Sequence, residues 1–205
     1  VDDWDGMGQR TTASGTVTLD DIEVPDTAVV PYTPIFEAPT TYGAQAQLLH
    51  SAIDVGIATG ALAEAVVQAG RARPHFEADV ERAVDDPLLV QIAGEATVTV
   101  RAAQALLAEA GRAVDRARAN PTAETTAAAS IEVATAKVAA TRAAVETANI
   151  LFELGGTRSA SGAANLSRYW RDARTHTLHD PERWKLYHLG RWALARQLPA
   201  GHSAL

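Results

Sequence analysis

The sequence predicts a mainly α-helical protein, a bundle of long helices of the four-helix type, preceded by a short β remnant. Two observations predict the bundle: from residue 42 onward apolar side chains recur three and four positions apart, and alanine is abundant in each such stretch. That spacing is typical of helices with one buried face, and small side chains let long helices approach closely. A third observation predicts the β remnant, because residues 14–25 alternate apolar and polar side chains.

Composition limits the class of protein. The chain has 205 residues, 47% of them hydrophobic, which suffices for one large domain or somewhat more. A net charge of -7 argues against a general nucleic-acid binder. The absence of cysteine excludes disulfides and zinc–thiolate sites and fits a cytoplasmic location. No apolar run reaches the ~20 residues that a membrane span needs, and the opening at Val1 leads us to expect a fragment.

Residues 1–40 are expected to be the end of a β-domain and a linker. Residues 14–25 are predicted to form one or two short strands with a turn at Asp20 and Asp21. Prolines then interrupt an extended connector, at Pro25, Pro31, Pro34 and Pro39. Because two or three strands cannot form a stable sheet alone, we expect their partners to lie outside this chain.

Residues 41–205 are expected to form the helical bundle domain. Three long helices are predicted over residues 42–72, 86–119 and 122–154, and two shorter ones over residues 163–174 and 180–198. Asp86 before Pro87 is typical of a helix N-cap followed by proline in the first turn. Asp180 before Pro181 repeats this pattern, so we expect Asp180 to cap the last helix rather than to act as a base.

The stretch RDARTHTLHDP, residues 171–181, contains two histidines three positions apart, His176 and His179. A metal site would need further ligands, which Asp172 and Asp180 could supply, but two arginines in the same stretch oppose a cation. The pattern also fits a polar helix junction. A third reading is a neutral imidazole that acts as a hydrogen-bond partner or acid–base catalyst. The residues themselves leave the last two readings open, and no metal is predicted.

A glycine-rich loop follows the third long helix, with Gly155, Gly156, Thr157 and Arg158 in succession. Exposed backbone N–H groups, a hydroxyl and an arginine suit a phosphate, although a glycine that ends a helix explains Gly155 equally well. Arg73 comes at the end of the first long helix. There it either complements the helix dipole or reaches a phosphate on a neighbouring subunit.

Two longer motifs resemble one known family. WDGMGQRTTASGTVTLDDIEVP, residues 4–25, resembles the end of the middle β-domain of the acyl-CoA dehydrogenase superfamily. The rest of the chain resembles the C-terminal helical domain of that superfamily, and FELGGTRSASG lies where the family has its Gly-Gly loop for the flavin pyrophosphate. The resemblance covers essentially the whole chain and implies that it corresponds to the C-terminal half of a family member.

The segment YWRDARTHTLHDP resembles the flavin-dependent monooxygenase branch of the superfamily, of the dibenzothiophene and sulfur-acquisition type. Dehydrogenases carry a catalytic glutamate where this chain has Asp180. The resemblance instead implies that His179 stabilises a C4a-peroxyflavin, with His176 close by. It also implies that Arg73 contacts the flavin phosphate and that the loop of residues 155–158 binds the cofactor.

Three hypotheses about function follow. The first is a monooxygenase that takes reduced FMN from a separate flavin reductase and oxygenates a small organic substrate, with sulfur compounds among the candidates. The second is an FAD-dependent, acyl-CoA dehydrogenase-like enzyme. The third is an inactive, truncated helical oligomerisation module. All three imply a homo-oligomer, a dimer or tetramer, since bundles of this kind form the centre of tetramers in the family.

Overall fold

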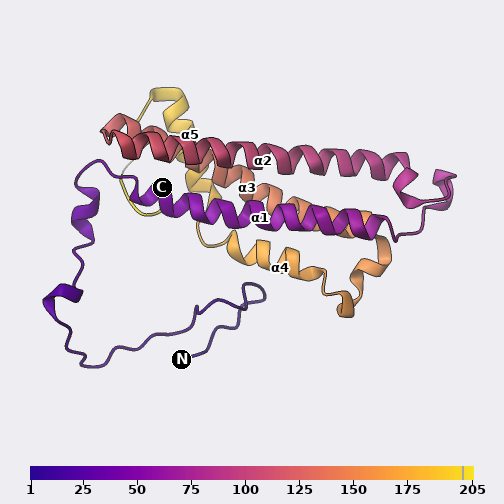
Figure 1. Cartoon of the computed structure of the whole chain (residues 1–205), viewed down its shortest axis with the longest axis horizontal. Coiled ribbons are helices and arrows are strands. Elements are labelled where there is room, and N and C mark those ends of the chain that lie inside the picture. The colour runs from indigo at the N-terminus through magenta and orange to yellow at the C-terminus, as the bar shows by residue number, and fades with distance from the viewer. Residues whose placement is uncertain (200) are drawn as a thin grey trace.

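The computed structural model describes residues 1–199 and 201–205, and within these residues it contains five α-helices (Figure 1). Three long helices lie side by side: α1 (Tyr42–Ala69), α2 (Pro87–Ala119) and α3 (Ala123–Gly155). The helix α3 is central, because it packs against α1 and α2 and also against the two short helices α4 (Ser167–His176) and α5 (Glu182–Ala195). The predicted helical bundle is therefore confirmed.

The interior between the long helices is filled mainly by alanine. Five alanines are completely buried where α1, α2 and α3 meet, and we call them the alanine seam: Ala58, Ala103, Ala140, Ala143 and Ala144. Each contributes only a methyl group, so the three backbones approach closely and leave little space between them. Larger apolar side chains, such as Leu151 and Leu154, are buried toward the C-terminal end of α3.

Local sequence signals set the helix ends. The Asp86 carboxylate accepts a hydrogen bond from the Leu88 backbone N–H at 2.9 Å, and Pro87 is the first residue of α2. Thr122 and Thr125 form a capping box at the start of α3. That helix ends at Gly155 and is followed by Gly156, whose φ of 65° lies in the region that favours glycine. The loop after it forms two 3₁₀ turns, over Gly156–Ala160 and Gly162–Ala164, so α4 begins later than predicted.

The predicted strands of residues 14–25 do not form within the described part of the chain. The segment has no neighbouring strand to pair with among the described residues, and without a paired strand no ladder of backbone hydrogen bonds forms. Its alternating apolar side chains are consequently exposed: Val17, Leu19, Ile22 and Val24. In Figure 1 the first forty residues run as a long arm beside the bundle.

One part of this arm contacts α4. The Asp172 carboxylate accepts a hydrogen bond from the Gln9 backbone N–H at 2.7 Å, and Arg171 donates to the Met7 carbonyl at 3.3 Å. Gly8 lies so close to the Arg171 carbonyl that a Cβ would collide with it. The WDGMGQR motif is thus held against the RDAR motif, two stretches that are more than 160 residues apart in sequence.

The expectation that no apolar run is long enough to span a membrane needs a correction. By length and composition alone, the helix α1 is long and apolar enough to do so. In the structure one face of α1 packs against α2 and α3 through residues such as Ala58, Ala61 and Ala65. The same face also buries a carboxylate, that of Asp54, which is 0% exposed. One face of this helix is therefore part of the bundle interior.

Candidate functional site

The two histidines of the RDARTHTLHDP stretch lie at the junction of α4 and α5. His176 is the last residue of α4 and is buried, whereas His179 lies in the following turn and is exposed. The prediction that Asp180 caps the last helix is wrong. Pro181 is the residue that precedes α5, and no side chain caps this helix. The Asp180 carboxylate instead faces α1, where it accepts a hydrogen bond from Gln47 Nε2 at 2.9 Å.

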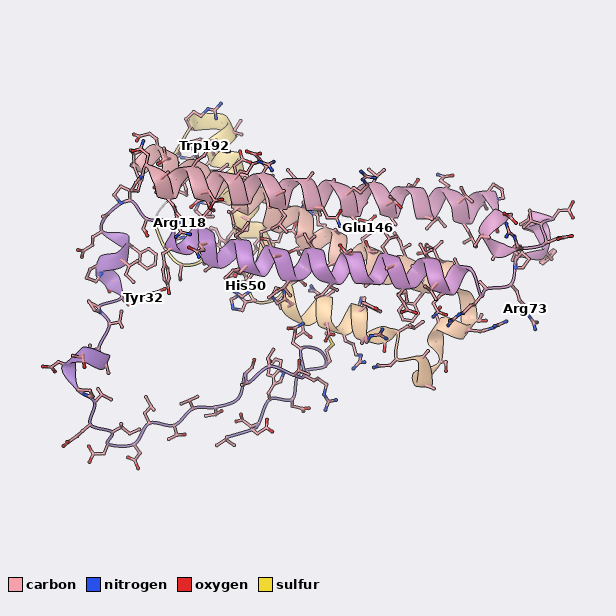
Figure 2. All side chains as sticks on the ribbon, viewed as in Figure 1. Tyr32, His50, Arg73, Arg118, Glu146 and Trp192 are labelled. Carbon is pink, nitrogen blue, oxygen red and sulfur yellow. The ribbon has the colours of Figure 1, made fainter. Side chains whose placement is uncertain are left out.

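A third histidine, His50 of α1, completes the cluster. His50 Nδ1 lies 3.2 Å from His176 Nε2. The His50 ring also stacks on the His179 ring, with centroids 4.1 Å apart and planes tilted by 29°. His179 Nδ1 in turn lies 2.9 Å from Asp180 Oδ2. We call His50, His176 and His179 the histidine cluster; Figure 2 labels His50, on the side of α1 that faces the junction.

An ion pair lies behind the histidine cluster in the bundle interior. Asp54 Oδ1 lies 2.6 Å from His176 Nδ1, and Lys137 Nζ of α3 donates to Asp54 Oδ2 at 2.7 Å. The Thr141 hydroxyl donates to the same oxygen at 3.3 Å. The Asp54 and Lys137 side chains are 0% and 2% exposed. A continuous chain of contacts therefore runs from Lys137 through Asp54 and His176 to His50.

Electrostatics favour an ionised Asp54 and a neutral His50. Burial acts to raise the pKa of Asp54, but the hydrogen bond with His176 and the charge of Lys137 outweigh it and leave the pKa below its usual value. Burial lowers the pKa of His50, and the neighbouring His179, His176 and Lys137 lower it further. Among the described residues no group of His, Asp and Glu is arranged to hold a metal ion.

The other side of Asp180 faces Lys185 of α5. Lys185 is 2% exposed and donates a hydrogen bond to the Ala204 carbonyl. Burial lowers its pKa from 10.5 to about 8, although the charge of Asp180 acts in the opposite direction. A cavity of about 370 Å³ opens here between α5 and the C-terminal residues. Its lining includes Asp180, Trp184, Lys185 and His188.

A second cavity, of about 590 Å³, lies at the opposite end of the bundle. It brings together all five residues predicted to bind the cofactor: Arg73, Gly155, Gly156, Thr157 and Arg158. Among the described residues neither guanidinium, that of Arg73 or that of Arg158, makes a hydrogen bond or an ion pair. Unpaired guanidinium groups beside a glycine-rich backbone are suited to a phosphate. Their role stays a prediction.

The cofactor residues and the histidine cluster are far apart within one chain. From His50 to Ala69 the helix α1 extends 19 residues, which at 1.5 Å per residue is about 29 Å. Arg73 lies beyond the end of that helix, as Figure 2 shows. The structure therefore gathers the predicted residues into two groups and does not bring the groups together.

Comparison with known proteins identifies relatives along nearly the whole chain. The probable FMNH2-dependent monooxygenase SfnC of Pseudomonas putida is 34% identical over 97% of this chain and 52% of its own length. Dibenzothiophene monooxygenase of Mycolicibacterium goodii is 33% identical over 97% of this chain and 50% of its own length. The chain thus spans about half the length of these curated relatives.

Solved structures give the same result. The complex of TdsC from Paenibacillus sp. A11-2 with FMN and indole superposes with a TM-score of 0.94 and 33% identity, over 100% of this chain and 55% of that one. Methanesulfinate monooxygenase MsuC from Pseudomonas fluorescens gives a TM-score of 0.91 at 34% identity, over 100% and 54%. The family model for the acyl-CoA dehydrogenase C-terminal domain matches residues 48–181. The chain therefore belongs to the acyl-CoA dehydrogenase family, as a C-terminal domain of that fold.

Proposed function

We propose that this chain is the C-terminal part of a monooxygenase that uses reduced FMN and O₂ to oxygenate a small organic substrate. The observation that carries the proposal is the histidine cluster beside Asp180. The family resemblance of the sequence implies that dehydrogenases have their glutamate base at the position of Asp180. Asp180, the carboxylate at that position, is engaged by His179 and Gln47. Two relatives that match 97% and 100% of the chain are named for FMNH₂-dependent or sulfur-directed oxygenation, which supports the same activity.

The residues present fit a flavin phosphate. The cavity that holds Arg73 and Arg158 offers two guanidinium groups and the glycine backbone of Gly155 and Gly156. Its lining also includes the carboxylates of Asp86 and Glu153, and that of Asp86 is bonded to the start of α2. FMN, when bound in its reduced form, would supply the activation of oxygen. His179 would then offer Nε2 to the reacting oxygen atoms, since its Nδ1 is turned to Asp180. His176 is too buried to reach them and acts through His50.

The distance between the two groups of residues supports a homo-oligomer. FMN is shorter than the roughly 29 Å of α1 that separates His50 from the phosphate cavity. One FMN can contact both groups only if Arg73 comes from one subunit and His179 from another. We therefore propose a dimer or tetramer in which each flavin site is shared. Apolar side chains on the outer face of α1, such as Leu49, Ile53 and Val66, are exposed and available for such contacts.

Two further features of the system follow from the proposed activity. Reduced FMN reacts readily with oxygen, so a flavin reductase is the proposed partner that supplies it. The proposed location is the cytoplasm, where reduced nicotinamides for such a reductase are made. The relative SfnC is named as FMNH₂-dependent, which supports a diffusible reduced flavin rather than a bound FAD.

An isotope experiment tests the activity. The purified protein is given chemically reduced FMN, ¹⁸O₂ and a panel of dibenzothiophene, indole and methanesulfinate, compounds taken from the names of its relatives. We expect one ¹⁸O atom in the product by mass spectrometry. His179→Ala should lower this rate by about 100-fold or more, the range for loss of an acid–base group, whereas Glu109→Gln on the outer face of α2 should leave it unchanged.

Two results would contradict the proposal. Acyl-CoA that bleaches a bound oxidised FAD, without ¹⁸O in the product, would establish the dehydrogenase-like alternative. A chain that binds no flavin and forms no product with any of the three compounds would support the oligomerisation module.

A further inference from the structure

We propose that Lys137, Asp54 and His176 are positioning residues that fix the tautomer and orientation of His50 and, through ring stacking, the orientation of His179. The tautomer itself follows from the contacts of the chain. Its consequence for turnover rests on the proposed monooxygenase function, in which His179 faces the reacting oxygen atoms. None of Lys137, Asp54 and His50 belongs to the motif that contains His176 and His179, and the three come from two other helices.

The ionised Asp54 determines where the hydrogen of His176 resides. A carboxylate only accepts hydrogen bonds, so at 2.6 Å from Asp54 Oδ1 the Nδ1 atom of His176 must carry a hydrogen. In a neutral imidazole the other nitrogen is then a bare acceptor. His176 Nε2 therefore presents its lone pair to His50.

The tautomer of His176 in turn determines that of His50. Two bare nitrogens facing each other would repel, so at 3.2 Å from His176 Nε2 the Nδ1 atom of His50 must be the donor. His50 Nε2 is then an acceptor on the far side of the ring. One buried carboxylate thus selects the tautomer of two successive histidines.

Lys137 keeps the hydrogen-bonded series Asp54–His176–His50 without net charge. An isolated carboxylate beside His176 would favour the imidazolium form, because opposite charges attract strongly in a buried site. Lys137 Nζ at 2.7 Å neutralises Asp54, so the pair presents hydrogen-bond acceptance without net charge. The charged and titratable groups that face His50 are His176, His179, Lys137 and Asp180. Of these only Asp180 favours a charged His50, and it is also held by Gln47.

The orientation of the His50 ring affects that of an exposed side chain, His179. It stacks on His179 with centroids 4.1 Å apart, and His179 is the exposed member of the cluster. A His50 that loses its hydrogen bond to His176 would rotate, and the His179 ring that rests on it would lose its support. Asp54, buried in the bundle, therefore acts on the reacting group through two intervening rings.

Nitrogen NMR tests the tautomers without reference to catalysis. The purified protein is labelled with ¹⁵N-histidine, and each of the six histidines is assigned by single substitution. In the wild type the contacts lead us to expect hydrogen on Nδ1 and none on Nε2 in both His50 and His176. Asp54→Asn should mix the two tautomers of both rings, because an amide can either accept or donate. Glu109→Gln, which alters an exposed carboxylate paired with arginine, should change neither ring.

A charge-matched variant separates positioning from folding. Asp54→Asn leaves Lys137 buried without a partner and can fail to fold. The double variant Asp54→Asn with Lys137→Met removes both charges together and should fold, while it still lacks the carboxylate that selects the tautomer. Hydrogen on Nε2 of His50 or His176 in the wild type, or tautomers unchanged in the double variant, would overturn the proposal.

Kinetics then test the consequence for turnover. In the double variant we expect kcat for ¹⁸O incorporation to fall about 10- to 100-fold, the range seen when partners that orient metal-bound imidazoles are removed. KM should stay unchanged, because the pair touches no substrate. Lys137→Met alone leaves a lone carboxylate and should move the acid limb of the kcat profile to higher pH. An unchanged kcat in the double variant would contradict the positioning role. A wild type that incorporates no ¹⁸O would contradict the proposed function, and the NMR result would be unaffected.

Discussion

At the scale of single residues, the molecule places a lysine and a carboxylate inside an interior made of methyl groups. Taking two such charges out of water costs several kcal/mol for each ion, and an apolar pair would pack at least as well. The geometry of Lys137 and Asp54 recovers part of that cost, through a 2.7 Å contact and two further hydrogen bonds from His176 and Thr141. Because such a pair adds little net stability over well-packed apolar residues, we infer that its role is to specify the state of His176.

Lys185 gives a pH-dependent prediction at the same scale. Its folded pKa of about 8 lies below the ordinary 10.5, so between these values the unfolded chain binds more protons and stability rises with pH. Protonating the buried amine lowers the free energy of unfolding by about 3 kcal/mol at pH 7, and this loss should become small by pH 10.5. Lys185→Met should therefore stabilise the protein more at pH 7 than at pH 10.

Urea unfolding of both proteins at the two pH values measures this difference, and the comparison cancels other groups that titrate. Lys137, which is also buried but is paired with Asp54, provides the contrast, because Lys137→Met should destabilise at both pH values. An equal effect of Lys185→Met at pH 7 and pH 10 would show that folding does not lower the pKa of the Lys185 amine.

The sequence predicted part of the site, and the reason lies in where its residues come from. His176 and His179 lie in one short motif, and the five predicted cofactor residues proved to line one cavity. His50, Asp54 and Lys137 could not be found, since they come from two helices and meet the motif only in the folded bundle. The one signal was a histidine and an aspartate four residues apart on a mostly apolar helix, a spacing that places them on the same face.

At the scale of elements, hydrogen bonds that are local in sequence were predictable and those that are distant were not. The starts of α2 and α3 follow from Asp86 and Thr122, whose side chains bond to backbone groups two or three residues away. The Asp180–Pro181 pair has the same pattern, yet its carboxylate bonds to Gln47, 133 residues distant. Residues 14–25 have the alternation of a strand but no neighbouring strand to form one.

The capping box of α3 gives a prediction for this element. Thr122→Ala removes the hydroxyl that accepts from the Thr125 backbone N–H at 3.2 Å. We expect the free energy of unfolding to fall by about 1 kcal/mol, within the usual range for a lost N-cap. Urea denaturation followed by circular dichroism measures it, and Thr122→Ser should retain most of the stability. A loss as large in the serine variant as in the alanine variant would mean that packing of the methyl group, not the cap, is at stake.

At the scale of the whole molecule, the bundle keeps its two groups of predicted residues far apart along its longest axis. The histidine cluster lies at the junction of α4 and α5, and Arg73 lies beyond the far end of α1. A long rigid bundle cannot close this distance by bending. We therefore propose that the flavin site is assembled from two copies of the chain.

Subunit complementation tests this arrangement. Arg73→Ala and His179→Ala should each be nearly inactive alone. When both are co-expressed, a mixed dimer contains one site with both residues intact and one with neither. Random pairing should thus restore about a quarter of the wild-type activity in a dimer with two shared sites.

The result that would rule out shared sites is a mixture no more active than its better component. The control is a mixture of the two separately purified proteins, assayed before subunits exchange, which should stay inactive. Recovery in the co-expressed sample and not in the control would assign Arg73 and His179 to different subunits of one site.

The alanine seam has a consequence for attempts to change the substrate specificity of the proposed enzyme. Because the backbones of α1, α2 and α3 are separated by little more than methyl groups, each added carbon must push whole helices apart. Selection for new substrates should accordingly leave the seam unchanged and enrich substitutions around His179 and in the loops. The helices that carry Asp54 and Lys137 should therefore keep their positions, and substitutions should be tolerated mainly outside the bundle interior.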